Sequence, residues 1–273
     1  RQMGLMEGMT DFSTSRNLEL LPTFTAIQFG TLDSTGSFVN QDTDPQAGLN
    51  IKYGVTSNFT ADFTINPDFS QIESDRPQID VNQRFPLFYP ELRPFFLEGA
   101  EIFQLTSPIN FVHTRTIVDP TFGGKLTGKG GRTTLGVLVA DDAAAGKRDD
   151  PSDPAFGQNA KVTIGRARYD LYTESQIGAT FTDREFLGSY SRVGVIDAQF
   201  RLSRASRFYF VAAQSQHRDE EGQERSGPVL GLVVTRTGRN LSANTFFGRT
   251  DPDFRTDVGF VRRVNEQRSS SRI

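Results

Sequence analysis

The chain has 273 residues, of which 36% are hydrophobic and 23% charged, and 24 Phe with 6 Tyr exclude wholesale disorder. No stretch reaches the roughly 18 uncharged apolar residues that a spanning helix requires, so a helical membrane protein is excluded. Thirty Lys and Arg against 33 Asp and Glu give a net charge of -3, and this balance predicts no nucleic-acid partner.

Apolar and polar residues alternate with a period of two along most of the chain, and helical periodicity is nearly absent. In Asn58–Ile65, apolar Phe59, Ala61 and Phe63 alternate with Thr and Asp. A strand of this kind lies between two different solvents. In chain order the predicted strands are Leu18–Phe29, Gly48–Val55, Asn58–Ile65, Asn110–Ile117, Gly123–Thr127, Thr133–Ala140, Lys161–Tyr169, Thr173–Thr182, Gly194–Leu202, Phe208–Gln216, Val229–Arg236, Leu241–Arg249 and Thr256–Arg263.

About thirteen strands of this length, joined in the second half by alternating short turns and longer loops, are typical of transmembrane barrels. We therefore predict an all-β fold, an antiparallel transmembrane β-barrel with about 12–14 strands in this chain. Bacterial single-chain barrels use even strand numbers, so either the count is off by one and residues 1–273 form one barrel domain, or they form part of a larger barrel.

Charged residues inside the strands are tolerated in a membrane barrel when they face the lumen or lie near a rim. Arg166 and Arg168 have the parity opposite to their apolar neighbours, and so does Arg201. These three arginines are the predicted lumen-facing charges. Arg236 shares the parity of apolar residues, and we place it at a rim.

Residues 66–104 interrupt the alternation, because they hold five of the 13 prolines together with many aromatic and charged residues. Proline cannot donate to a strand ladder, so this segment is not a run of central strands. Long irregular segments in compact proteins are usually functional or packed insertions. We predict a plug or constriction within the barrel, formed by Phe85, Phe88, Tyr89, Glu91, Arg93, Phe95, Phe96 and Glu98.

The run Phe85–Ala100, FPLFYPELRPFFLEGA, closely resembles a signature of one bacterial family, as does the lead-in Asp62–Asp75. Gly123–Gly128 and Asp257–Phe260 are similar to the same family. It is the outer-membrane β-barrel domain of unknown function that commonly follows a family-nine carbohydrate-binding module. The resemblance implies the outer membrane of a Gram-negative bacterium, contact with its lipid, and a carbohydrate-derived solute.

Three functions remain open from the sequence. The favoured one is a pore or solute-uptake component for an oligosaccharide or other small solute, selecting by charge and size through the wall arginines. The second is a surface glycan hydrolase that uses Glu91 and Glu98 as paired carboxylates with raised pKa. The third is a non-transporting scaffold for an unidentified extracellular protein partner. For Glu91 and Arg93 the favoured interpretation is structural, an Arg–Glu network that pins the segment to the wall.

No cofactor or metal site is predicted. The chain lacks cysteine, and its two histidines, His113 and His217, have no metal-site or catalytic-triad context. The aspartates of residues 141–153 do not have the spacing of a calcium-binding EF-hand, and we interpret them as a solvated acidic loop. The basic end is interpreted as strand-end charge, with anionic lipid head groups as the alternative ligand of Arg262, Arg263, Arg268 and Arg272.

Overall fold

The computed structural model describes residues 17–28, 30–32, 36–40, 42–69, 72 and 86–273. Phe85, one of the predicted plug residues, lies outside the described residues. No described helix is long and apolar enough to cross a membrane. The fold is all-β and antiparallel, as predicted.

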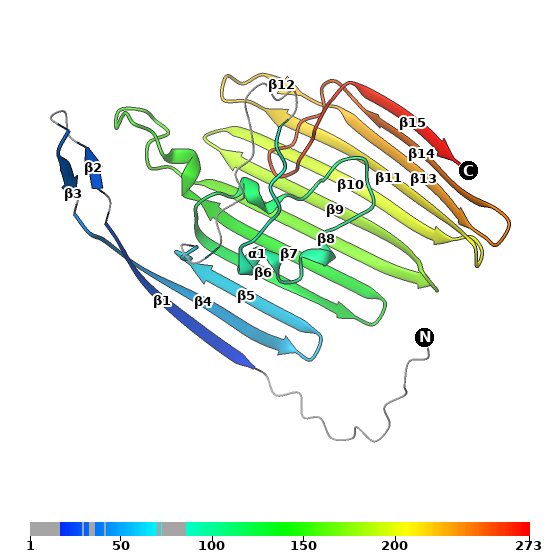
Figure 1. The fold of residues 1–273 in the computed structure, drawn as a ribbon, viewed down its shortest axis with the longest axis horizontal. Coiled ribbons are helices and arrows are strands. Elements are labelled where there is room, and N and C mark those ends of the chain that lie inside the picture. The colour runs from blue at the N-terminus through cyan, green and yellow to red at the C-terminus, as the bar shows by residue number, and fades with distance from the viewer. Residues whose placement is uncertain (1–16, 29, 33–35, 41, 70–71, 73–85) are drawn as a thin grey trace.

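One 13-stranded antiparallel sheet contains nearly all the strands, in the order β1-β4-β5-β6-β7-β8-β9-β10-β11-β13-β14-β15, with β12 paired to β11 (Figure 1). A separate hairpin joins β2 and β3. The strands are β1 (Leu18–Ile27), β2 (Gly30–Leu32), β3 (Phe38–Asn40), β4 (Asp44–Thr56), β5 (Phe59–Ile65), β6 (Pro120–Gly130), β7 (Thr133–Asp142), β8 (Ala160–Tyr172), β9 (Ser175–Phe186), β10 (Ser189–Arg201), β11 (Ser206–Arg218), β12 (Glu224–Arg225), β13 (Pro228–Thr237), β14 (Ser242–Thr250) and β15 (Glu266–Arg272).

The two ends of this sheet do not pair with each other. Among the described residues, β1 pairs with β4 on one side alone, and β15 pairs with β14 on one side alone. Figure 1 shows these two edges at opposite ends of an open sheet. Two open edges present unpaired backbone groups.

Short and long connections lie at opposite rims of the sheet. Short turns at one rim comprise residues 57–58, 131–132, 173–174, 202–205 and 238–241. At the other rim the connections are mostly long, the longest being residues 66–119, followed by 143–159, 28–43 and 251–265. We call these the short-turn rim and the long-loop rim.

Eleven predicted strands are confirmed, and two are wrong. Asn110–Ile117 forms an isolated bridge and the 3-10 helix η2 (Thr114–Thr116), and Thr256–Arg263 contains only the other half of that bridge, Asn110 with Phe260. Both segments cross one face of the sheet instead of joining it. The sequence analysis missed β15, because its residues EQRSSSR have no apolar side to alternate.

The sheet therefore has a covered face and an outer face. Residues 86–119 and 251–265 lie over the covered face (Figure 1) and carry α1 (Pro94–Leu97), η1 (Ala100–Ile102) and η2, whereas η3 (Ala143–Gly146) follows β7. Two apolar clusters form beneath them, one containing Phe96 and Leu138 and the other Phe111 and Val211. Each fully buried phenylalanine contributes about 1.5–3 kcal/mol through removal of its surface from water.

Candidate functional site

Lys125 fixes the short helix α1 to the covered face. Its Nζ donates to the carbonyl oxygens of Phe95 at 2.6 Å and Glu98 at 2.7 Å, and it lies 3.4 Å from Oδ2 of Asp62 on β5. These carbonyls belong to the C-terminal end of α1, where a cation is favourable. One buried lysine therefore joins the helix to two strands.

Arg93 and Glu91 form the main hydrogen-bond network within residues 86–119. The Arg93 guanidinium donates Nε to Oε1 and Nη2 to Oε2 of Glu91, both at 2.8 Å, and also donates to the carbonyl oxygens of Ile117 and Thr114. Thr114 Oγ1 donates to Glu91 Oε2 at 2.7 Å. The Arg93 guanidinium lies 4.3 Å from the Phe96 ring centroid. The network holds the start of the segment against its end.

The electrostatics of Glu91 favour a carboxylate that is ionised at neutral pH. Burial would raise its pKa, but the hydrogen bonds from Arg93 and Thr114 outweigh burial and hold the pKa below its ordinary value. A general acid for glycoside cleavage requires the opposite shift. Glu98 pairs instead with Lys52 on β4 and is half exposed, so the two carboxylates serve different contacts.

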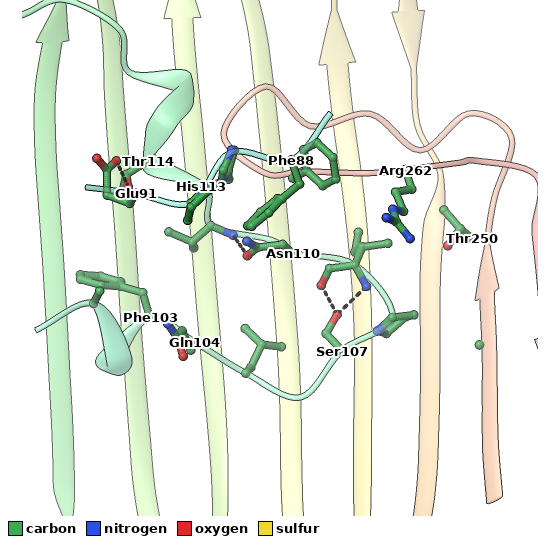
Figure 2. A pocket seen from close by; sticks show the side chains of 18 of the residues that line it. Phe88, Glu91, Phe103, Gln104, Ser107, Asn110, His113, Thr114, Thr250 and Arg262 are labelled. Atoms are coloured by element: carbon green, nitrogen blue, oxygen red, sulfur yellow. Dashed lines mark hydrogen bonds between the residues drawn. The ribbon is translucent and has the colours of Figure 1, made fainter. Parts of the chain in front are cut away.

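A cavity of about 860 Å³ opens between the segment and the sheet. Phe88, His113 and Phe260 form one wall, with centroids of Phe88 5.0 Å from His113 and 5.1 Å from Phe260. Figure 2 shows Phe88 and His113 on one side and Arg262 on the other, reaching into the space between Phe88 and Thr250. Burial lowers the pKa of His113, so its imidazole is neutral at pH 7.

The three predicted wall arginines all lie on the covered face. Arg166 is buried and makes a bidentate pair with Asp197, at 2.7 and 2.9 Å, beside a smaller cavity of about 250 Å³. Arg168 is half-buried and donates to Thr134 Oγ1 at 3.4 Å. Arg201 lies at the short-turn rim, paired with Glu174 at 2.8 Å.

The other predicted plug residues have different neighbours. Phe96 is buried in the core cluster with Phe103, and Phe95 packs edge-on against it with centroids 5.0 Å apart. Phe88 faces the cavity, and Tyr89 is half-buried.

The other titratable residues considered for a metal or catalytic site make structural contacts. His217 Nε2 lies 3.6 Å from Asp257 Oδ1, in the position of a wall residue. Asp142 accepts backbone hydrogen bonds from Asp119 and Ala144, and Asp150 accepts one from Ser152. Within the described part of the chain, no three His, Asp or Glu side chains are grouped to hold a metal ion.

Sequence reasoning missed the contribution of residues 260–268 to the cavity. Phe260 and Arg262 lie far from Phe88 in sequence, and a strand was expected there. The bridge between Asn110 and Phe260, with N–H···O distances of 3.2 and 2.7 Å, brings the two segments together. The basic and aromatic composition of residues 260–268 was the available signal.

Residues 16–117, less than half of the chain, match a family model described as "Domain of unknown function (DUF5916)". This range contains the signature Phe85–Ala100. No curated protein matches.

Solved structures of OmpT, an outer membrane protein of Vibrio cholerae, are similar at a low level. The in-vitro folded trimer form has 10% identity and a TM-score of 0.36, covering 94% of this chain and 97% of that chain. The outer-membrane expressed form has 11% identity and a TM-score of 0.34, with 95% and 96% covered. The function is therefore argued from the residues of this chain.

Proposed function

We propose that this chain forms the wall of an outer-membrane β-barrel, with residues 86–119 folded against the inner side as a constriction on a solute path. The covered face would be the lumen side and the outer face the lipid side. The long-loop rim would be extracellular, as in known barrels.

The polarity of the outer face carries this proposal. Its mid-strand residues are apolar and exposed, with Phe63 42%, Val137 45%, Phe181 46% and Ile196 58% exposed. On β5–β11, β13 and β14, charged outer-face residues occur only among the first or last four positions of a strand; they are Asp141, Lys161, Asp183, Glu185, Arg192, Arg218, Arg236 and Arg249. An apolar band bounded by charge matches a bilayer and is unfavourable in water.

The covered face is mixed, because the apolar clusters that contain Leu138 and Val211 lie on it beside charged and hydroxyl side chains. It contains the paired charges of Asp62 with Lys125 and Arg166 with Asp197 in mid-strand positions, together with Thr64, Thr180 and Thr182. A soluble β-sandwich buries apolar residues between sheets and exposes polar ones. Here the open face is the apolar one, which supports lipid contact.

Residence in a bilayer also requires partners for the edges of β1 and β15, because unpaired backbone groups are costly in hydrocarbon. The proposal therefore includes closure of the sheet by pairing at both edges. We further propose a small solute of carbohydrate origin, on the family resemblance of residues 85–100, with the wall arginines selecting by charge.

The test is gel migration of membrane-extracted protein, boiled and unboiled in SDS, followed by conductance in a planar bilayer. A shift on boiling and a measurable conductance are expected. Protein that stays in the soluble fraction without a shift would refute the membrane assignment. A shift with no conductance would refute the solute path and favour the scaffold alternative. No observation favours the hydrolase, because both of its candidate carboxylates are engaged in ion pairs.

A further inference from the structure

Three arginines border the 860 Å³ cavity without a carboxylate partner. Arg262, Arg263 and Arg268 are exposed, and none of their guanidinium groups has an ion pair or hydrogen bond among the described residues. Arg262 reaches into the cavity opposite Phe88 (Figure 2). The side of the cavity next to β14 and β15 is therefore strongly basic.

Acidic groups on the cavity wall do not neutralise this charge. Glu91 also lines the cavity, but its two carboxylate oxygens are occupied by Arg93 and Thr114. Glu266 is the other carboxylate of the wall, against three arginines. Elsewhere on the covered face, Lys125 is paired with Asp62 and Arg166 with Asp197.

The opposite wall offers flat rings without charge. Phe88, His113 and Phe260 contact one another, with His113 5.6 Å from Phe260 between centroids. Ring faces of this kind bind the apolar face of a planar or pyranose ring. Amide and hydroxyl groups of Gln104 and Thr250 line the same space and provide polar contacts.

We propose that this cavity binds a small organic acid that carries a ring, with its carboxylate on Arg262 and Arg263 and its ring against Phe88 and Phe260. Guanidinium groups bind carboxylates through paired hydrogen bonds, and a ring fixes the orientation of the acid. The inference rests on the proposed function, since it names the class of solute that the interior would receive.

The test is calorimetric binding to the detergent-purified chain with two matched pairs of probes, glucuronate with glucose and benzoate with benzyl alcohol. Within at least one pair, the acid is expected to bind at least about tenfold tighter than its neutral partner. The pair that responds identifies the ring as a sugar or an aromatic one. Equal binding within both pairs, or no binding of either acid, would overturn the inference.

Variants assign the effect to the cavity. Arg262→Gln with Arg263→Gln should remove the preference for the acid, whereas Arg272→Gln on β15, outside the cavity, should retain it. A preference unchanged in the double variant would overturn the site. Circular dichroism of each variant reports folding. Binding is measured in detergent and does not depend on membrane assembly. A protein whose gel migration shifts on boiling but that binds no acid would refute this inference alone. A protein that binds the acid but shows no gel shift would refute the membrane proposal alone.

Discussion

Arg93 organises the segment over the covered face because it satisfies several acceptors at once. Its guanidinium is buried between the Glu91 carboxylate, two backbone carbonyls and the Phe96 ring. Loss of one partner from such a network leaves a buried charge without compensation. The same chemistry in the half-exposed pair of Lys52 with Glu98 is weakened by water.

Arg93→Met is expected to lower the free energy of unfolding by about 3–5 kcal/mol, since it leaves the Glu91 carboxylate buried and unpaired. Lys52→Met, the matched control, should cost less than about 1 kcal/mol. Urea unfolding followed by circular dichroism measures both. Equal losses in the two variants would contradict the central role of Arg93.

The lowered pKa of Glu91 predicts that the free energy of unfolding depends on pH in the acidic range. Its pKa is lowered in the folded state, so its contribution is present above the unfolded value of about 4.3 and is lost as the pH falls through the folded pKa. The slope for one proton is at most about 1.4 kcal/mol per pH unit. Glu91→Gln should be less stable at pH 7 and should lack this component between pH 5 and 2 in thermal melts. An unchanged acid profile would argue against the assignment.

At the scale of elements, residues 86–119 dock on glycines of the sheet. A Cβ on Gly136 of β7 would lie 2.8 Å from Ile102 Cγ2 and 2.9 Å from Phe103 Cζ, and one on Gly231 of β13 would lie 2.8 Å from Pro108 Cδ. Strand glycines often mark such close approaches. The missing side chains of these glycines therefore leave shallow sites in the sheet, into which residues 86–119 fit.

Gly136→Val is expected to displace η1 and destabilise the protein by about 1–3 kcal/mol, because the added methyl groups overlap the segment. Gly165→Val on the neighbouring strand β8 is the matched control, since a Cβ there meets nothing within 4 Å. Limited proteolysis of residues 86–119 should accelerate in the first variant only. In the bilayer assay the first variant should also conduct more.

At the scale of the whole molecule, the open face of the sheet is apolar, in contrast to the solvent-facing side of a water-soluble sheet protein. Phe, Val, Leu and Ile side chains are exposed on the open face, whereas the covered face combines apolar residues such as Leu138 and Val211 with buried Asp, Lys, Arg and Thr. The register across neighbouring strands preserves this sorting; Ala179, Ile196 and Ala212, for example, are aligned on the outer face.

Ile196→Arg is expected to impair membrane assembly, because an outer-face arginine at mid-strand costs about 2–4 kcal/mol at the bilayer centre. Thr163→Arg, on the same face nearer the long-loop rim and opposite Asp183, should assemble almost normally. The fraction of protein that shifts on boiling measures assembly. Equal assembly of the two variants would contradict a bilayer centred on the sheet.

The sequence by itself determined the fold class and the sorting of side chains between two faces. In Thr173–Thr182 the alternation places Ile177 and Phe181 on one face and Thr180 and Thr182 on the other, as the structure does. Period-two alternation is a local property of the strand backbone, so it can be read without knowledge of neighbours.

The tertiary structure alone decided which apolar segments pair and which cover the sheet. Phe111 and Val258 carry the same apolar signal as strand residues, yet they pack onto the covered face from irregular segments. β15 has no apolar signal and is a strand because its backbone pairs with β14. The cavity depends on the same long-range contacts, because Phe88 meets Phe260 only after the two crossing segments have docked on the sheet. Strand pairing and docking join residues distant in sequence, so local pattern cannot specify them.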